Sequence, residues 1–241
     1  MTALNISIII PAYNEEGRLG DTLQRILSYM NEKGHDYEII VIDDGSRDDT
    51  KAVAERFQQY RVRTIRNDRN RGKGYAVRHE MLEAQKTLVL FSDADLSTPI
   101  EELENLAARI LAGEAQVAIG SRAIPGARIE VSLPAYRVAM GKIFNLFVRM
   151  VAIGGVHDTQ CGFKLFIRET AREIFRRQRL YGFGFDVEIL AIARQLGYRV
   201  VEVPVRWINS AETKVDVFRD SAAMFFDLFK IRWNGFLGMY K

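Results

Sequence analysis

Two aspartates, Asp93 and Asp95, come directly after an apolar run in the segment LVLFSDADLSTP, residues 88–99. Side chains alternate along an extended chain, so both carboxylates would project to one side, with the small Ala94 between them. Two neighbouring carboxylates repel, and desolvation adds to the cost. Mg²⁺ or Mn²⁺ would relieve the repulsion, because such ions prefer one or two carboxylates together with diphosphate oxygens. The pair therefore predicts a metal and diphosphate site; the alternative is an acidic approach to a helix capped by Thr98.

Residues suited to the rest of a nucleotide follow three other apolar or β-rich runs. A proline turn and an aromatic ring can lie against a base, and acids can accept hydrogen bonds from ribose hydroxyls and a base N–H. A lysine between glycines ahead of a helix offers phosphate a cation and backbone amides. In chain order these residues are Pro11, Tyr13, Glu15, Asp43 or Asp44, and Lys73. The lysine motif RGKGYA is not a P-loop, and no G-x-G-x-x-G follows the first apolar run.

The elements that must position these residues alternate between two hydrophobic periods. Strand-like runs occupy residues 6–10, 37–43, 62–67, 87–93 and 115–121, and helical patterns occupy 19–34, 48–60, 75–85 and 100–114. This alternation predicts an α/β fold with a mainly parallel central sheet and helices on both faces. Ligands of such sheets bind beyond the carboxyl ends of the strands, where the residues above would gather. The run 199–207 predicts a final edge strand, since a sheet edge tolerates Pro204.

Composition limits the function classes. The chain has 241 residues, 48% of them hydrophobic and 27% charged, which predicts a globular protein of one large domain or a domain with an appendage. A net charge of +3 does not indicate nucleic-acid binding. The single cysteine, Cys161, excludes an internal disulfide and has no histidine beside it to make it a nucleophile. We expect a cytoplasmic chain, because neither a signal peptide nor an apolar run of about 18 residues is recognisable.

The last segment predicts an amphipathic helix over residues 216–241. Aromatic residues recur there at helical spacing, with polar residues opposite: Phe226, Phe229, Trp233, Phe236 and Tyr240 against Asp227, Lys230, Asn234 and Lys241. Such a helix can lie in the interface of an anionic membrane, or it can pack on a core or form an oligomer. We therefore divide the chain into a domain over 1–215 and this helix.

Six segments carry a family resemblance. In order they are SIIIPAYNEEGRL, EIIVIDDGSRDDT, RNRGKGYAVRHEM, FSDADLSTPIEEL, VAIGSR and DTQCGFKLF. Over about residues 5–235 the chain resembles the family 2 inverting glycosyltransferases of the GT-A fold, in the branch that glucosylates dolichyl phosphate, close to the polyprenyl-phosphate mannose synthases. The resemblance implies metal-dependent transfer of glucose from UDP-glucose to a polyprenyl monophosphate with inversion. The alternatives are the same transfer from GDP-mannose and a nucleotide-sugar-binding protein without turnover.

The resemblance also implies that the domain over 1–215 has a nucleotide-sugar half (1–122) and an acceptor half (123–215), and it implies residue roles on the donor side. Pro11, Tyr13, Glu15, Asp43 and Asp44 would hold the nucleoside, Lys73 would lie near the diphosphate or the base, and Asp93 with Asp95 would form the nucleotide face and metal site. The mannose synthases have a glutamine two residues after the second aspartate, where this chain has Ser97. The metal shell would then be completed by water or by Gln160.

On the acceptor side, resemblance to the mannose synthases implies that Arg122 and Arg137 hold the lipid phosphate, whose paired oxygens suit a guanidinium fork. Asp186 lies where family members with hydroxyl acceptors keep a base, so it would orient the acceptor or the sugar; the alternatives are a plain helix-start acid and Glu188 in its place. A phosphate acceptor is already anionic and needs orientation more than a base. The expected partners are a nucleotide sugar, a polyprenyl phosphate, the cytoplasmic face of a membrane, and a second copy or a membrane-anchored protein.

Overall fold

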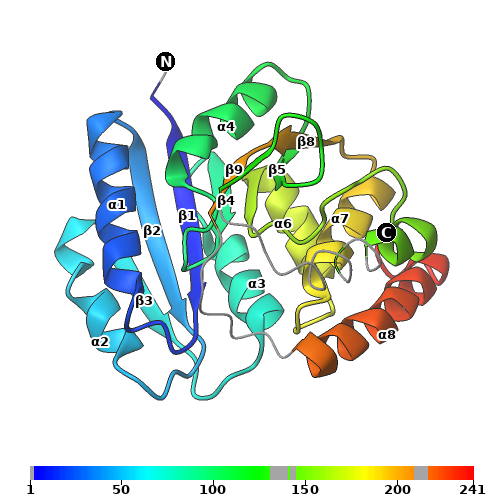
Figure 1. Cartoon of the computed structure of the whole chain (residues 1–241), viewed down its shortest axis with the longest axis horizontal. Helices are drawn as coiled ribbons and strands as arrows, with labels where there is room; N and C mark the ends of the chain where they lie inside the picture. The colour runs from blue at the N-terminus through cyan, green and yellow to red at the C-terminus, as the bar shows by residue number, and fades with distance from the viewer. Residues whose placement is uncertain (1–2, 131–140, 142–144, 209–216) are drawn as a thin grey trace.

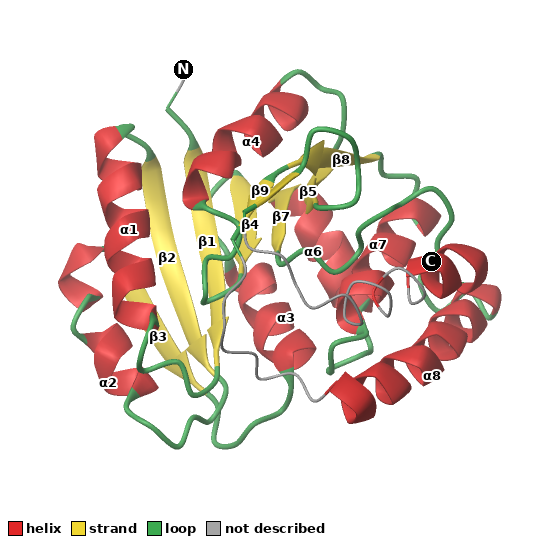
Figure 2. Cartoon of the chain, in the orientation of Figure 1, coloured by secondary structure: helices red, strands yellow, loops and turns green. Residues whose placement is uncertain are grey.

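The computed structural model describes residues 3–130, 141, 145–208 and 217–241, with the side chains of all of these except 217–221. Its main sheet contains β1 (Asn5–Ala12), β2 (Asp36–Asp43), β3 (Val62–Arg66), β4 (Leu88–Ser92), β5 (Val117–Ser121), β7 (Phe163–Ile167) and β8 (Val200–Pro204). The strand order is β3-β2-β1-β4-β7-β5-β8, so β8 is the predicted edge strand. A short second sheet pairs β6 (Arg128–Ile129) with β9 (Arg206–Trp207) (Figures 1 and 2).

The mainly parallel sheet is confirmed, with one strand reversed. β1 pairs in parallel with β2 and β4, β2 with β3, and β5 with β8. β7 runs antiparallel to both β4 and β5, with Ser92 opposite Phe163. β7 was not among the predicted strands, because its five residues, FKLFI, include a lysine that interrupts the apolar run. Reversal places the start of β7, and the loop before it, at the carboxyl edge of the parallel strands.

Helices cover both faces of the sheet (Figure 2). One hydrophobic core contains residues of α1 (Leu19–Glu32), α2 (Thr50–Glu55) and α4 (Leu103–Leu111), and the other contains residues of α3 (Lys73–Glu83), α6 (Arg168–Arg177), α7 (Phe185–Gln195) and α8 (Val217–Phe236). The short 3-10 turns η1 (Gln58–Tyr60) and η2 (Ile100–Glu102) adjoin α2 and α4. β1 supplies both cores by alternation, with Ile8 and Ile10 in the first and Ile9 in the second.

The predicted helix cap at Thr98 is wrong. Pro99 precedes the η2 turn, and no side-chain hydrogen bond caps that turn. The Thr98 side chain is buried instead, with Oγ1 3.6 Å from the Sγ of Cys161. Tertiary packing against the loop before β7 has therefore taken a side chain that the local pattern reserved for the helix.

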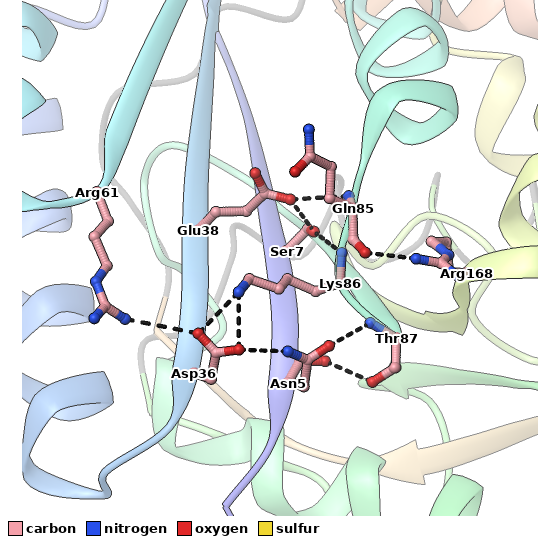
Figure 3. Close-up of polar contacts among 9 residues, drawn as sticks. All are labelled: Asn5, Ser7, Asp36, Glu38, Arg61, Gln85, Lys86, Thr87 and Arg168. Atoms are coloured by element: carbon pink, nitrogen blue, oxygen red, sulfur yellow. Dashed lines mark hydrogen bonds and ion pairs between the residues drawn. The ribbon is translucent and has the colours of Figure 1, made fainter.

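Polar contacts tie the strands together at their amino edge (Figure 3). The Asp36 carboxylate of β2 accepts hydrogen bonds from Asn5 Nδ2 of β1 at 2.5 Å and from Lys86 Nζ at 2.8 Å. The Asn5 side-chain oxygen in turn accepts the Thr87 N–H at 2.7 Å, and Glu38 accepts the Ser7 hydroxyl at 2.5 Å. These contacts hold β1, β2 and the approach to β4 in register, so their opposite ends are presented together at the carboxyl edge.

Helix α8 has two apolar faces. Met224, Leu228 and Ile231 are buried, and α8 packs against α7 (Figure 1). The opposite face exposes an aromatic stripe, which we define as Phe226, Phe229, Trp233 and Phe236. The sequence analysis placed polar residues opposite the aromatic ones and Tyr240 among them. Both details are wrong, because a buried apolar face lies opposite the stripe and Tyr240 is only 1% exposed. No helix in the described ranges has the length and hydropathy needed to cross a membrane.

We predict opposite outcomes for two neighbouring substitutions in α8. Leu228→Ala should lower the free energy of unfolding by about 2 to 5 kcal/mol, because Leu228 is fully buried and truncation leaves a cavity. Phe229→Ala should change it by no more than about 0.5 kcal/mol, because that side chain is 51% exposed. Urea denaturation measures both. Equal losses for the two variants would mean that the stripe is also packed.

Candidate active site

The carboxyl edge of the sheet gathers the predicted donor-side residues. β1, β2 and β4 are parallel, so the segments beginning at Tyr13, Asp43 and Asp93 leave the sheet on the same side. Contacts between the segments join them further: the Asn14 N–H donates to Ser46 Oγ at 2.9 Å, and the Glu15 N–H donates to Thr50 Oγ1 at 2.7 Å. Pro11 is buried and Tyr13 is half-buried, whereas the Glu15 carboxylate is paired with the Arg18 guanidinium.

The two acids after β2 have different surroundings. Asp44 accepts hydrogen bonds from Asn67 Nδ2 at 2.7 Å and from the backbone N–H groups of Arg71 and Gly72 at 3.0 and 2.8 Å. It therefore holds the loop that begins α3. Asp43 Oδ1 accepts the Ser46 N–H, but its Oδ2 is buried and receives no hydrogen bond from the described residues, although Arg66 Nε lies 3.4 Å away. Asp43 is thus the acid with hydrogen-bonding capacity left, at a buried oxygen beside Arg66, and its contact with a nucleoside stays a prediction.

Lys73 lies among the predicted metal-site acids. Its Nζ is 2.7 Å from Asp93 Oδ1 and 5.2 Å from the ring centroid of Phe91. Burial alone would lower the pKa of Lys73, but the carboxylates of Asp93, Asp186 and Asp95 outweigh burial and hold the pKa above its ordinary value. The ammonium is therefore a permanent positive charge at the place where the sequence analysis expected a cation and a diphosphate.

The geometry of Asp93 and Asp95 differs from the expected one. β4 ends at Ser92, and the Leu96 N–H donates to the Asp93 carbonyl at 3.2 Å, so the two acids lie on a turn and the argument from strand alternation is wrong. They still share one locality, because both carboxylates act on Lys73. Asp95 Oδ1 accepts the Ser97 N–H at 2.9 Å.

The pair fits a hard divalent cation. Such an ion takes one or two carboxylates and fills its remaining positions with phosphate oxygens and water. The Asp93 and Asp95 side chains are 33% and 21% exposed, so both can be reached from solvent, and Asp93 already holds a cation in the Lys73 ammonium. Within the described ranges no cluster of three or more His, Cys, Asp and Glu side chains is arranged for a metal. Gln160, the predicted further ligand, donates from Nε2 to Met224 Sδ at 3.7 Å, so its role stays a prediction.

Arg122 is held from two sides after β5. Its Nε and one terminal nitrogen donate to the two oxygens of Asp158 at 2.7 and 2.8 Å, and its guanidinium carbon is 5.3 Å from the ring centroid of Trp207. Asp158 is 2% exposed; burial would raise its pKa, but Arg122 outweighs burial and keeps it lowered. Asp158 takes two of the five N–H donors of the guanidinium, so contact with an acceptor phosphate stays a prediction. Arg137, the other predicted phosphate ligand, lies outside the described residues.

A second buried ion pair, between Lys164 and Asp186, lies near the pair of Arg122 and Asp158. Lys164 of β7 is fully buried, and its ammonium donates to the Asp186 carboxylate and to the Cys161 carbonyl. Lys164 Nζ is 5.5 Å from the ring centroid of Phe91, the ring that Lys73 also contacts, so both lysines adjoin one aromatic ring. Asp186, at the start of α7, is 3% exposed and bonded to Lys164. The sequence analysis missed Lys164, although a lysine within the apolar run FKLFI signals a buried cation that needs an acid.

Two other candidates from the sequence are enclosed. Cys161 is 1% exposed, and burial raises the pKa of its thiol to about 11, which agrees with its rejection as a nucleophile. Glu188, the alternative to Asp186, is fully buried, and its carboxylate accepts hydrogen bonds from the backbone N–H groups of Arg179 and Leu180 and from the Tyr240 hydroxyl.

Comparison with known proteins identifies the class to which this fold and site belong. Residues 7–175 match the family model described as Glycosyl transferase family 2. The chain belongs to this family, and it is a glycosyltransferase with the GT-A fold that the sequence motifs predicted.

Several curated relatives are named dolichyl-phosphate beta-glucosyltransferase. The chain is 36% identical to the dolichyl-phosphate beta-glucosyltransferase of Dictyostelium discoideum and 38% identical to that of Drosophila melanogaster; each match covers 98% of this chain and 76% of the relative. Among solved structures, glucosyl-3-phosphoglycerate synthase from Mycobacterium tuberculosis, in complex with Mn²⁺, UDP-glucose and phosphoglyceric acid, superposes with a TM-score of 0.70 at 20% identity. That match covers 95% of this chain and 80% of the other and supports the fold alone.

We predict that Gly162→Ala will disturb the acidic pair. A Cβ at this position would lie 1.8 Å from Asp93 Oδ2, and the Asp93 N–H already donates to the Gly162 carbonyl, so the carboxylate must move. Binding of UDP with Mn²⁺, measured by calorimetry, should weaken about tenfold or more. Gly20→Ala within α1 is the control, since its Cβ would meet only an ordinary contact at 3.6 Å. Equal affinity for wild type and Gly162→Ala would separate Asp93 from the donor site.

Proposed function

We propose that this protein transfers glucose from UDP-glucose to a polyprenyl monophosphate such as dolichyl phosphate, with inversion and with Mg²⁺ or Mn²⁺. The observation that carries the proposal is the similarity, across nearly the whole chain, to relatives named dolichyl-phosphate beta-glucosyltransferase. The arrangement of the carboxyl edge supports it, because acids for a nucleoside and a metal lie beside a lysine for a diphosphate.

On the donor side, Asp43 Oδ2 is ion-paired with Arg66 and receives no hydrogen bond from the described residues, so it suits a base with a ring N–H to donate, as uracil has. Asp44 would act indirectly, because its carboxylate accepts the backbone N–H groups of Arg71 and Gly72 and so orders the loop that precedes Lys73. Pro11 and Tyr13 lie on the adjacent segment, where the ring of Tyr13 can lie against the base. Glu15 and Arg18 form an ion pair there, which leaves the ribose contact of Glu15 a prediction.

The chemistry is a single displacement. A phosphate oxygen of the acceptor bonds to C1 of glucose while the bond from C1 to the UDP oxygen breaks, and the electron pair leaves with UDP. The acceptor oxygen carries no proton to remove, which suits a site where Asp186 is bonded to Lys164. A metal held by Asp93 and Asp95 would supply charge to the departing diphosphate. Lys73 adds a fixed positive charge at the same place, and Arg122 would orient the acceptor phosphate.

Transfer assays test this proposal. The protein, Mg²⁺ and dolichyl phosphate are incubated with each labelled sugar nucleotide, and we expect product from UDP-glucose. Asp95→Asn should lower kcat/KM by about a hundredfold or more, because the leaving group loses its counter-charge. Glu32→Gln, at a carboxylate that is 73% exposed on the far end of α1, is the matched control. Product from GDP-mannose alone, or full activity in Asp95→Asn, would refute the proposal.

We further propose that the aromatic stripe of α8 lies in the interface of an anionic membrane, which holds the lipid acceptor. Most of the large apolar side chains that are exposed in the described ranges belong to α8, the residues just after it, and the neighbouring segment 145–150. The Phe147 and Phe225 rings, 5.3 Å apart, join the two segments. Lys230 and Arg232 flank the stripe, which suits anionic head groups. The cytoplasmic side stays a prediction.

Vesicle sedimentation tests the membrane proposal. Trp233→Ala/Phe236→Ala should weaken binding to vesicles containing anionic lipid about tenfold or more, because both side chains are mostly exposed and large. Tyr60→Ala, which removes a 51% exposed ring far from α8 in the sequence, should leave binding unchanged. If the wild type ignores vesicles and forms a dimer that the double substitution dissociates, the stripe is an oligomer contact instead.

A further inference from the structure

The buried carboxylate of Glu188, on α7, accepts hydrogen bonds from the loop that precedes α7. It accepts the backbone N–H groups of Arg179, at 3.0 Å, and Leu180, at 2.8 Å. Every hydrogen bond it receives from the described residues comes from a neutral donor, and burial raises the pKa of Glu188. Burying a carboxylate without a cation is unfavourable, and the two loop amides are among the groups that compensate for it.

The loop that Glu188 holds, residues 178–181, lies directly against the first turn of α3. Buried Gln178 donates from Nε2 to the carbonyl of Gly74 at 2.9 Å and to that of Leu180 at 2.7 Å. The Tyr75 N–H donates to the Tyr181 carbonyl at 3.2 Å. Two hydrogen bonds therefore join the first turn of α3 to the loop, one at the Gly74 carbonyl and one at the Tyr75 N–H.

The contact is too close to absorb a shift. A Cβ on Gly72 would lie 2.5 Å from the Tyr181 carbonyl oxygen, and a Cβ on Gly74 would lie 2.7 Å from that of Leu180. Gly72 also has a backbone φ of 98°, which residues with a side chain rarely adopt. These two glycines flank Lys73. Because backbone rests on backbone on both sides of it, movement of the loop moves the lysine that faces Asp93.

On its other side, Glu188 is bonded to the segment that follows α8. The Tyr240 hydroxyl, 1% exposed as a residue, donates to Glu188 Oε1 at 2.7 Å and accepts a hydrogen bond from Asn234 Nδ2 at 3.2 Å. Nearer the start of α8, Asp227 packs against Gly184, where a Cβ would lie 2.6 Å from its Oδ2. Gly184 precedes α7, the helix that carries Glu188. The segment after α8 is thus bonded to α7 at Glu188, and α8 itself lies against the residue that precedes α7.

We infer that Glu188 and Tyr240 are positioning residues for the donor site. Tyr240 orients the Glu188 carboxylate, Glu188 holds the loop 178–181, and that loop sets the place of Lys73 opposite Asp93. The inference rests on the proposed function in one respect, that Lys73 meets the diphosphate of the donor. It adds a physical connection between the donor site and the helix that bears the aromatic stripe.

Binding of UDP in the presence of Mn²⁺, measured by calorimetry, tests the inference. Tyr240→Phe removes one hydroxyl, and Glu188→Gln leaves one accepting oxygen in place of two; each should weaken UDP binding about fivefold to tenfold, in the direction of Lys73→Ala. The matched control is Tyr29→Phe, which removes a phenol that donates to Glu104 at 3.3 Å, away from this loop. It should leave UDP affinity unchanged at a similar shift in Tm.

Hydrogen exchange without ligand provides the second measurement. In Tyr240→Phe and Glu188→Gln, amides of residues 71–76 and 178–182 should exchange faster than in the wild type, while those of α1 should not. The inference is overturned if amide exchange in both segments is unchanged. It is also overturned if Lys73→Ala weakens UDP binding but Tyr240→Phe and Glu188→Gln do not. If the wild type fails to bind UDP, the proposed function falls, and the exchange experiment alone then decides whether Glu188 controls the α3 turn.

Discussion

Three carboxylates, those of Asp93, Asp95 and Asp186, and the ammonium groups of Lys73 and Lys164 lie close together at the carboxyl edge of the sheet. Unit charges about 4 Å apart interact by about 4 kcal/mol at the effective dielectric of a protein surface, so acids without cations would not remain there ionised. Lys73 faces Asp93 and Lys164 faces Asp186, and both ammonium groups adjoin the Phe91 ring. This alternation of charge stabilises the ionised acids while the Asp95 side chain stays 21% exposed, and the geometry of the proposed donor site depends on it.

The reversed strand β7 makes the alternation possible. A parallel strand in its place would send the loop before it to the opposite edge, because parallel strands all start there. Because β7 is reversed, the loop before it brings Gly162 against Asp93 and Asp158 against Arg122. Lys164, near the start of β7, lies between Phe91 of β4 and Ile119 of β5. The loop 158–162 therefore contacts residues that follow β4 and β5 at one place.

Helix α8 connects this site to the surface of the molecule. Its inner face completes the second hydrophobic core through Leu228 and Ile231, and its outer face carries the aromatic stripe. A helix that was only a core element would not expose Trp233 and Phe236, and one that was only an anchor would not bury Leu228 and Ile231 or pack against α7. Its two apolar faces allow one element to serve both the core and an interface.

The sequence by itself determined which chemistry gathers at the edge. Alternating hydrophobic periods predicted the parallel strands of the main sheet and most helices, but not β7. The acids after β4, the glycine-flanked Lys73 and the six family segments predicted a nucleotide-sugar site, because local pattern and residue type are sufficient for such predictions. Tertiary structure alone decided how each side chain is used. The partners of Asp44 and Asp186 are distant in the chain, and so are Glu188 from Tyr240 and β7 from β4. Such contacts depend on which faces the folded elements bury against each other, and periodicity within one element carries no information about them.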